Sequence, residues 1–293
     1  MAGWRTIVIT DRCKLDLRYN NMNIRKNDKL SQVNIGEIGV LIVESTSVSI
    51  TTALLSELVK NKIKVIFCDE MHNPQSELMS YYGSFDCSER IKFQANWKDE
   101  IKGKLWAIIV FEKIKNQKEL LRYFNIKQYK LLEEYMVEIE NFDKTNREGH
   151  SAKVYFNAIF GNSFCREDKE NPINMALNYG YSIILSIFNR EIVSNGYITN
   201  LGIFHRNKFN PFNLSCDLME PFRPIIDKKI VEMNIENFGT DEKREIQKIL
   251  SSQLIINGQK YFIQDAIRIY TKSLLDALDS EDFSNLRLYE NEL

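Results

Sequence analysis

Alternating and unbroken apolar segments characterise the N-terminal part of the chain. Ile7 and Ile9 alternate within one short segment, and Leu15 and Leu17 alternate within the next. Because a period of two places alternate side chains on one face of a strand, both segments predict strands. Residues 38–43 form an unbroken apolar run, which predicts a strand buried on both faces.

Shorter signals lie between and after these strands. Asn20-Asn21 predicts a tight turn, because asparagine tolerates positive φ. Leu54 and Leu58 have helical spacing and predict a short helix, and residues 65–68 predict another buried strand. The residues available to cap the short helix are Ser49, Thr51 and Thr52.

From about Ser88 the apolar residues recur at the spacing of helices. A long helix is predicted over residues 174–195, with Gly196 at its C-terminal end. Asn257-Gly258, between two apolar runs, predicts a two-residue hairpin. The apolar residues expected on one face of the first helix in this half are Ile101, Leu105, Ile108 and Phe111.

The change of period predicts an α+β protein with two domains. A small N-terminal β-rich domain covers residues 1–87, and a larger, mostly α-helical domain covers residues 88–293. The hydrophobic fraction of 44% and charged fraction of 27% are typical of a globular protein. A net charge of −1 argues against a protein that coats DNA through bulk positive charge, so any DNA-binding surface must be local.

Cysteine usage and apolar run lengths bear on location. The five cysteines are scattered and form no CxxC pair, which predicts neither a zinc ribbon nor a disulfide framework and favours a reducing compartment. The first residues lack the pattern of a signal peptide, and the apolar runs are too short to span a bilayer. We therefore expect a cytoplasmic protein with no membrane partner.

Candidate chemistry first occurs in residues 146–156. Thr145 and Glu148 have the spacing of a capping box, so a helix start is one interpretation. It leaves Gly149 unexplained, since glycine is a poor helix former and permits close approach of another backbone or a ligand.

His205 has the most distinctive setting of the three histidines. It follows an apolar, strand-like run and precedes Arg206 and Lys208, so a neutral imidazole would lie beside cations suited to phosphate. His72 and His150 lack that setting.

A third segment, residues 215–227, combines acidic residues with prolines. If Ser215 caps a helix, Asp217 and Glu220 lie on one face of it. Pro221 and Pro224 would interrupt the helix at both acidic positions, a cost that proteins concentrate at functional sites. The alternative interpretation is a kinked surface helix in which Glu220 pairs with Arg223.

Together these segments supply carboxylates, an imidazole and cations. Carboxylates suit Mg²⁺, an added imidazole favours Mn²⁺, and neighbouring cations suit a phosphodiester substrate. No GxxxxGK[ST] loop occurs, which argues against a Mg²⁺-dependent ATPase.

NREGHSAKVYF, LGIFHRNK and DLMEPFRPIID resemble the three signature blocks of the CRISPR-associated protein one family, the spacer-acquisition integrases. The resemblance implies Mg²⁺ or Mn²⁺ ligands at Glu148, His205 and Glu220. Many relatives carry Asp in place of Glu220, so Asp217, one turn earlier, stays open as a ligand or as a holder of metal-bound water. Candidates for contacting DNA are Arg147, Lys153, Tyr155, Arg206, Lys208 and Arg223.

The resemblance also implies an assembly and a reaction. Residues 1–87 would form a homodimer, and residues 88–293 would carry catalysis. Two dimers would flank a small second acquisition protein and join the 3′ hydroxyls of a double-stranded DNA fragment to the CRISPR repeat by transesterification in a prokaryotic cytoplasm. The compact chain is similar to versions found with a single large effector nuclease, which, with an accessory acquisition protein, is a further candidate partner.

Two other functions fit the same residues. One is a structure-specific, metal-dependent DNA nuclease that does not transfer strands, because hydrolysis differs only in the attacking group. The other is a non-catalytic DNA-organising scaffold in which the acidic residues only cap and pair.

Overall fold

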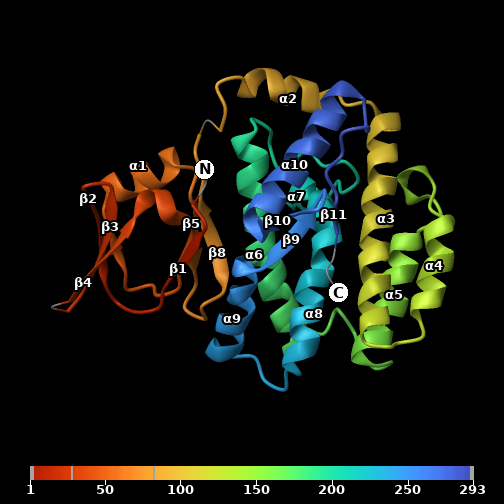
Figure 1. Cartoon of the computed structure of the whole chain (residues 1–293), viewed down its shortest axis with the longest axis horizontal. Helices are drawn as coiled ribbons and strands as arrows, with labels where there is room; N and C mark the ends of the chain where they lie inside the picture. The colour runs from red at the N-terminus through yellow and green to blue at the C-terminus, as the bar shows by residue number, and fades with distance from the viewer. Residues whose placement is uncertain (1–2, 28, 82, 291–293) are drawn as a thin grey trace.

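The protein consists of a β-rich N-terminal part and a larger helical part, which lie side by side (Figure 1). The structure is a computed structural model that describes residues 3–27, 29–81 and 83–290. The α+β architecture predicted from the change of period is confirmed. Strand β8 ends at Leu78 and helix α2 begins at Cys87, so the connection runs over residues 79–86.

One sheet of the N-terminal part faces the helical part. Its strand order is β1-β5-β7-β8, in which β1, β5 and β7 are parallel and β8 is antiparallel to β7. The apolar run at 38–43 forms β5, and every residue of this strand is buried, as predicted. The bounds are β1 (Arg5–Ile9), β5 (Ile38–Val43), β7 (Lys64–Cys68) and β8 (Pro74–Leu78).

A second sheet, of order β4-β3-β2-β6, lies on the outer side. The register of β2 and β3 pairs Arg18 with Asn21, and the two residues between them, Tyr19 and Asn20, have positive φ. The turn therefore begins one residue earlier than predicted. The short helix α1 is capped by Thr51, whose hydroxyl accepts from the amide of Leu54. The bounds are β2 (Lys14–Arg18), β3 (Asn21–Lys26), β4 (Lys29–Asn34), η1 (Ile35–Glu37), β6 (Ser49–Ile50) and α1 (Thr52–Lys60).

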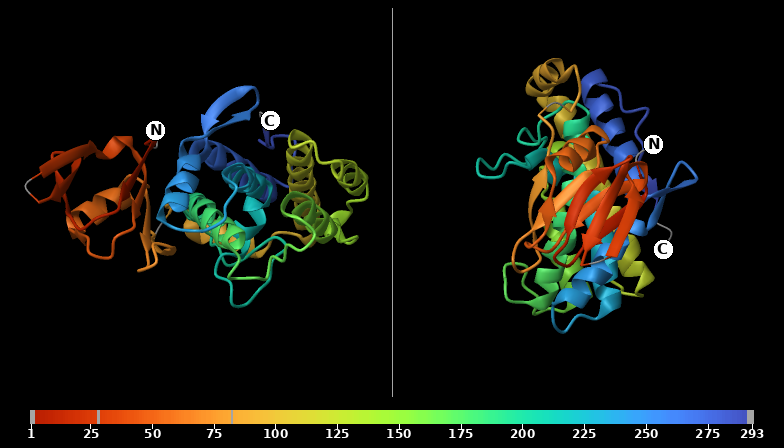
Figure 2. Two further views of the ribbon diagram at one scale, coloured as in Figure 1. Left: turned by 90° about the horizontal axis from the view of Figure 1, so that it is seen from below. Right: turned by 90° about the vertical axis from the view of Figure 1, so that its left-hand side faces the viewer.

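Helix α6 (Pro172–Ser194) is the buried axis of the helical part. It contacts α7, α8, α9 and α10, and also β7 and β8 of the first sheet (Figure 2). The predicted long helix is confirmed, with Asn171 as its N-cap and Gly196 at φ 87° beyond its end. The other helices are α2 (Cys87–Ala95), α3 (Asp99–Tyr123), α4 (Tyr129–Val137), η2 (Asn141–Asp143), α5 (Arg147–Phe160), α7 (Asn213–Met219), η3 (Glu220–Phe222), α8 (Arg223–Met233), α9 (Thr240–Gln247), η4 (Lys248–Ser251) and α10 (Ile263–Ser280).

The hairpin predicted at Asn257-Gly258 is confirmed. It joins β9 (Gln253–Ile256) to β10 (Gln259–Phe262), and both turn residues have positive φ. Strand β11 (Tyr289–Glu290) pairs with β9 on the other side.

The face predicted for α3 is wrong in its second half. Ile101 and Leu105 are buried, but Ile108 is half-buried and Phe111 is exposed. Helix α3 contacts α4 and α5 on one side and η3, α8 and α10 on the other, so a wider face is buried than an amphipathic stripe provides. That face continues through polar residues, including Lys113 and Asn116.

Successive residues of β5 belong to two different cores. Leu41 and Val43 pack in the core of the N-terminal part, whereas Val40 and Ile42 join the core of the helical part. Since side chains alternate across a strand, β5 fixes the first sheet against the helices.

Replacing Ile42, which is 1% exposed, by alanine should therefore lower the free energy of unfolding by about 2–5 kcal/mol, because it leaves a cavity between the two parts. Urea denaturation measures this. Leu30→Ala, at a side chain with 52% exposure, is the control and should change stability by only about 0.5 kcal/mol. Equal effects of the two substitutions would contradict the shared core.

Candidate metal and nucleic-acid site

The helix that carries Asp217 and Glu220 is broken as the two prolines predict. Helix α7 ends at Met219, a 3-10 turn covers Glu220–Phe222, and α8 begins at Arg223. The carbonyl of Pro221 accepts hydrogen bonds from the Asn116 side chain at 3.0 Å and from the Tyr289 hydroxyl. This break is buried, so the alternative of a kinked surface helix is wrong, although its Glu220–Arg223 pair exists.

Ser215 does not cap this helix. It lies inside α7, is fully buried, and the N-cap position is Phe212. The preceding residues, 202–212, form a loop rather than the strand-like run expected before His205.

Asp217 holds this loop together. Its buried carboxylate accepts from the backbone amides of Ile203, Phe204 and His205, and it contacts Nδ1 of the His205 ring at 2.6 Å. Two of these contacts fall on each oxygen, so both oxygens are engaged within the protein. The hydrogen bond that the ring donates to Asp217 raises the pKa of His205, against the opposing effect of burial.

The His205 ring is fixed but not enclosed. Its side chain keeps 40% exposure, and the ring meets Trp106 edge-on at 5.8 Å between centroids. Phe204 stacks on the same indole at 4.4 Å. Because Nδ1 faces Asp217, Nε2 is the nitrogen left for a ligand.

Glu148 lies in the first turn of α5, but no capping box forms there. Asp143 caps the helix instead, since its carboxylate accepts from the amides of Arg147 and Glu148, each at 2.8 Å. The Thr145 hydroxyl donates to the carbonyl of Glu138. The Glu148 side chain is therefore free to point toward α3.

The close neighbour of Gly149 is a side chain, not the backbone or ligand that was expected. A Cβ at this position would lie 2.8 Å from Oδ1 of Asn146, so glycine makes room for that side chain rather than for a backbone or ligand. Asn146 itself has a left-handed backbone, with φ 53°.

Lys113 links the acidic residues and was not identified from the sequence. Its buried ammonium lies between Glu148 and Glu220 and donates a hydrogen bond to one carboxylate oxygen of each. The sequence carries no distinct signal for this role, because α3 has other charged residues beside Lys113, among them Glu112 and Lys115. Burial lowers the pKa of Lys113, but Glu220 and Glu148 outweigh burial and raise it, so the lysine stays charged.

Glu220 forms the floor of the site. One carboxylate oxygen meets Lys113, and the other accepts from Nε of Arg223 at 2.9 Å. Burial would raise the pKa of Glu220, but Arg223 and Lys113 outweigh it and hold the pKa at about 2. The positive charge of His205 makes a smaller contribution that also lowers this pKa.

The donor set fits a hard divalent cation in its chemistry. Two carboxylates and an imidazole are ligands that Mg²⁺ and Mn²⁺ accept, and the Lys113 ammonium already occupies a cation position between the carboxylates. In the described ranges, no three His, Cys, Asp or Glu side chains lie close enough together to hold a metal without rearrangement. Lys113 is the group that separates Glu148 from Glu220.

The prediction that Tyr155 contacts DNA is wrong. Its side chain is fully buried, and its hydroxyl donates to Asp227 at 2.9 Å. The Tyr181 hydroxyl donates to the same carboxylate. Burial raises the pKa of Asp227 to about 6, although both tyrosines oppose the shift.

The other candidate DNA contacts differ in accessibility. Lys153 and Lys208 are exposed, and Arg206 has 68% side-chain exposure with Asp99 3.7 Å away.

Arg147 is mostly covered and pairs with Glu138 at 3.0 Å. Arg223 has 24% side-chain exposure because its guanidinium is engaged by Glu220 and the ring of Tyr181.

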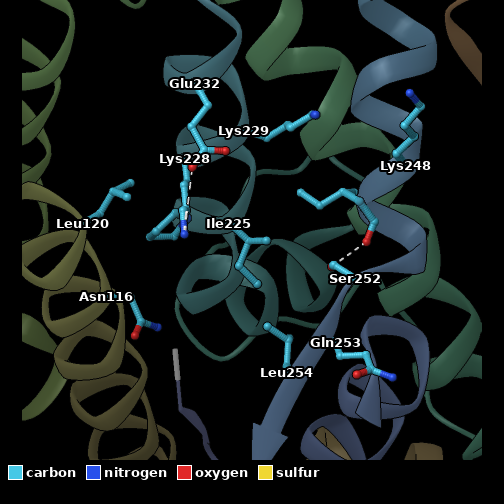
Figure 3. A pocket seen from close by; sticks show the side chains of 12 residues that line it. Asn116, Leu120, Ile225, Lys228, Lys229, Glu232, Lys248, Ser252, Gln253 and Leu254 are labelled. Atoms are coloured by element: carbon cyan, nitrogen blue, oxygen red, sulfur yellow. Dashed lines mark hydrogen bonds and ion pairs between the residues drawn. The ribbon is translucent and has the colours of Figure 1, made fainter. Parts of the chain in front are cut away.

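A pocket of about 360 Å³ is lined by residues of α3, α8, η4 and β9 (Figure 3). Its lining includes Asn116, which also donates to the carbonyl of Pro221, but none of its lining residues is a candidate ligand. Its lysines are matched by carboxylates, with Lys228 4.0 Å from Glu232 and Lys229 3.4 Å from Glu245. The candidate ligands Glu148, His205 and Glu220 therefore lie outside this pocket.

Comparison with known proteins identifies the family. The model of the family described as CRISPR associated protein Cas1 matches residues 6–266. The chain belongs to the Cas1 family. It is 31% identical to the CRISPR-associated endonuclease Cas1 of Neisseria meningitidis serogroup C (strain 8013), over 98% of this chain and 96% of that protein.

Solved structures share the fold. A casposase bound to integration product matches 96% of this chain and 92% of its own, with a TM-score of 0.76 and 16% identity. A chain of a Cas6-RT-Cas1–Cas2 complex matches 99% of this chain over 36% of its own length, with a TM-score of 0.75 and 17% identity. Within the described part of the chain, no helix has the length and apolar character needed to cross a membrane.

The Asp217 contacts generate a prediction about stability. Asp217→Asn keeps the shape of the side chain but turns an amide group toward backbone N–H donors. The free energy of unfolding should fall by about 1–3 kcal/mol, as expected when buried donors lose an acceptor. Chemical denaturation checks this, with Asp99→Asn, at an aspartate of 71% side-chain exposure, as the control that should leave stability unchanged. An unaltered Asp217→Asn protein would contradict the role of Asp217 in holding the loop.

Proposed function

We propose that this chain is a metal-dependent DNA integrase and endonuclease of CRISPR adaptation that joins 3′ hydroxyl ends of short DNA fragments to the CRISPR repeat. The observation that carries the proposal is the convergence of Glu148 and Glu220 on one buried cation position, together with an imidazole oriented by Asp217, which precedes Glu220 by three residues. The endonuclease name of the Neisseria relative and the integration product bound by the casposase support it.

Three residues would hold the metal. Glu148, His205 through Nε2, and Glu220 form the donor set, and Asp217 acts as a positioning residue because its oxygens already serve the loop and the ring. A bound Mg²⁺ or Mn²⁺ would neutralise charge that develops on the phosphodiester oxygens. Arg223 keeps Glu220 ionised and oriented.

The exposed cations would position DNA. Arg206 and Lys208 lie on the loop that carries His205, so phosphates held there come close to the imidazole. Lys153 lies on α5, the helix that carries Glu148, and would be a further contact to DNA. Arg147 and Arg223 would contribute after giving up part of their present pairing.

Assembly belongs to the proposal as well. Residues 1–87 would form the homodimer, and a small second acquisition protein would bridge two dimers on double-stranded DNA. The Cas1–Cas2 complex among the structural neighbours supports a partner of that kind.

Glu220→Ala should lower the rate of strand transfer by a factor of about 100 or more, because metal stabilisation of transition-state charge is worth several kcal/mol. DNA affinity should hold or rise slightly, since a negative charge is removed. Integration yield with Mg²⁺ and with Mn²⁺, measured beside a binding curve, separates the two effects. Glu232→Ala, on α8 outside the site, is the matched control. Normal integration by both Glu220→Ala and Glu148→Ala would refute the metal site.

Arg206→Ala and Lys208→Ala should show the opposite pattern. Binding weakens, and the slope of log affinity against log salt becomes shallower by about one unit per lost phosphate contact. The measurement is DNA affinity at several salt concentrations. Lys272→Ala, at a lysine on α10 with 60% side-chain exposure, serves as the charge-matched control. An unchanged salt slope in both loop variants would place the DNA elsewhere.

The two alternative functions are separated by the products. Joined ends in a plasmid that bears a repeat indicate strand transfer, whereas cut DNA without joined ends indicates a nuclease. Absence of any carboxylate-dependent metal binding or product would leave a DNA-organising scaffold.

A further inference from the structure

The cation position between Glu148 and Glu220 is filled by a side chain of the protein itself. Lys113 extends from the middle of α3, and its ammonium contacts both carboxylates. The lysine side chain is 7% exposed and that of Glu220 is 6% exposed, so this pairing takes place away from bulk water. Glu148, at 32%, and His205, at 40%, lie on the side that opens to solvent.

Charge balance explains why a cation belongs there. Glu148 and Glu220 each bring a negative charge to the same side chain, Lys113, and Arg223 supplies one positive charge at the far oxygen of Glu220. Two carboxylates that share a site repel each other strongly unless a positive charge separates them. Lys113 provides that charge without a metal.

A divalent ion needs the same carboxylate oxygens that Lys113 uses. An ammonium and a metal ion cannot both occupy one position between the carboxylates, and they would repel each other at adjacent positions. Lysine suits a reversible occupant, because its point charge is carried on a flexible four-carbon stem, unlike the planar guanidinium of arginine.

We propose that Lys113 is a built-in competitor of the divalent ion: its ammonium holds Glu148 and Glu220 together in the metal-free protein and is displaced when the ion binds. This inference rests on the proposed metal site. Lys113 thereby lowers the apparent metal affinity, since only the fraction of molecules with the lysine withdrawn can accept the ion. In return it keeps the acidic cluster intact when no metal is present.

The direct test is Mn²⁺ binding to the full chain, measured by calorimetry for the wild type and for Lys113→Met. Methionine keeps the length of the side chain and removes the charge. We expect Lys113→Met to bind Mn²⁺ at least about tenfold more tightly than the wild type. This factor corresponds to a wild type in which Lys113 occupies the site in about nine-tenths of the molecules or more. In the presence of a chelator, the same variant should unfold at a lower temperature than the wild type, and Mn²⁺ should restore it. Lys115→Met, on the same helix with 36% side-chain exposure, should match the wild type in both measurements.

Equal or weaker Mn²⁺ binding by Lys113→Met would overturn the proposal. Glu148→Gln and Glu220→Gln test the metal site separately. If Mn²⁺ binding by the wild type survives both, the metal site is wrong; if they abolish binding while Lys113→Met binds no better than the wild type, only the displacement is wrong. If neither the wild type nor Lys113→Met binds Mn²⁺, both proposals fall.

A second measurement needs no variant and so does not depend on whether Lys113→Met folds. Amine-reactive labelling of the wild-type chain, followed by mass spectrometry, reports how accessible each lysine is. Lys113 should react several-fold faster with Mn²⁺ present than with a chelator, because the displaced ammonium leaves its buried ion pairs, whereas Lys115 should react at one rate in both. Equal labelling of Lys113 in the two conditions would overturn the displacement.

Discussion

The buried charge pairing around Glu220 is the constraint on which the rest of the site depends. A carboxylate with 6% side-chain exposure is tolerable only because Lys113 approaches one oxygen and Arg223 the other. Each cation comes from a different element, so α3, η3 and α8 must all be in place before the charge is satisfied. Glu148 joins the same group through Lys113, which fixes α5 against α3.

A second constraint acts on the loop that carries His205. Residues 202–212 form no helix or strand, so side chains supply many of their backbone partners. Asp217 accepts from the amides of residues 203–205, and Asn213 bonds to the backbone of Asn207. One carboxylate therefore orders three amides and sets the imidazole ring. The cations of this loop lie at the surface, where Arg206 is 3.7 Å from Asp99 and Lys208 lies over the ring of Phe209.

The N-terminal part is joined to the helical part by more than the connecting segment. Strand β5 contributes side chains to both cores, and Asn189 of α6 donates to Glu77 of β8, which also accepts from buried Lys64. These contacts would therefore hold the helical part in a fixed orientation relative to any partner that binds the N-terminal part. The two parts of the fold therefore form one framework.

The sequence by itself determined the elements that depend on local chemistry. Apolar runs predicted β5 and α6, prolines predicted the break at Glu220, and Asn257-Gly258 predicted its hairpin, since each signal acts within a few residues. The signature segments likewise named Glu148, His205 and Glu220 as candidate ligands. Only the tertiary structure decided that Tyr155 is buried, that Asp143 rather than Thr145 caps α5, and that Lys113 lies between Glu148 and Glu220. The two contacts of Lys113 join residues that are 35 and 107 positions apart in the sequence. No local pattern specifies which buried polar groups will meet across helices.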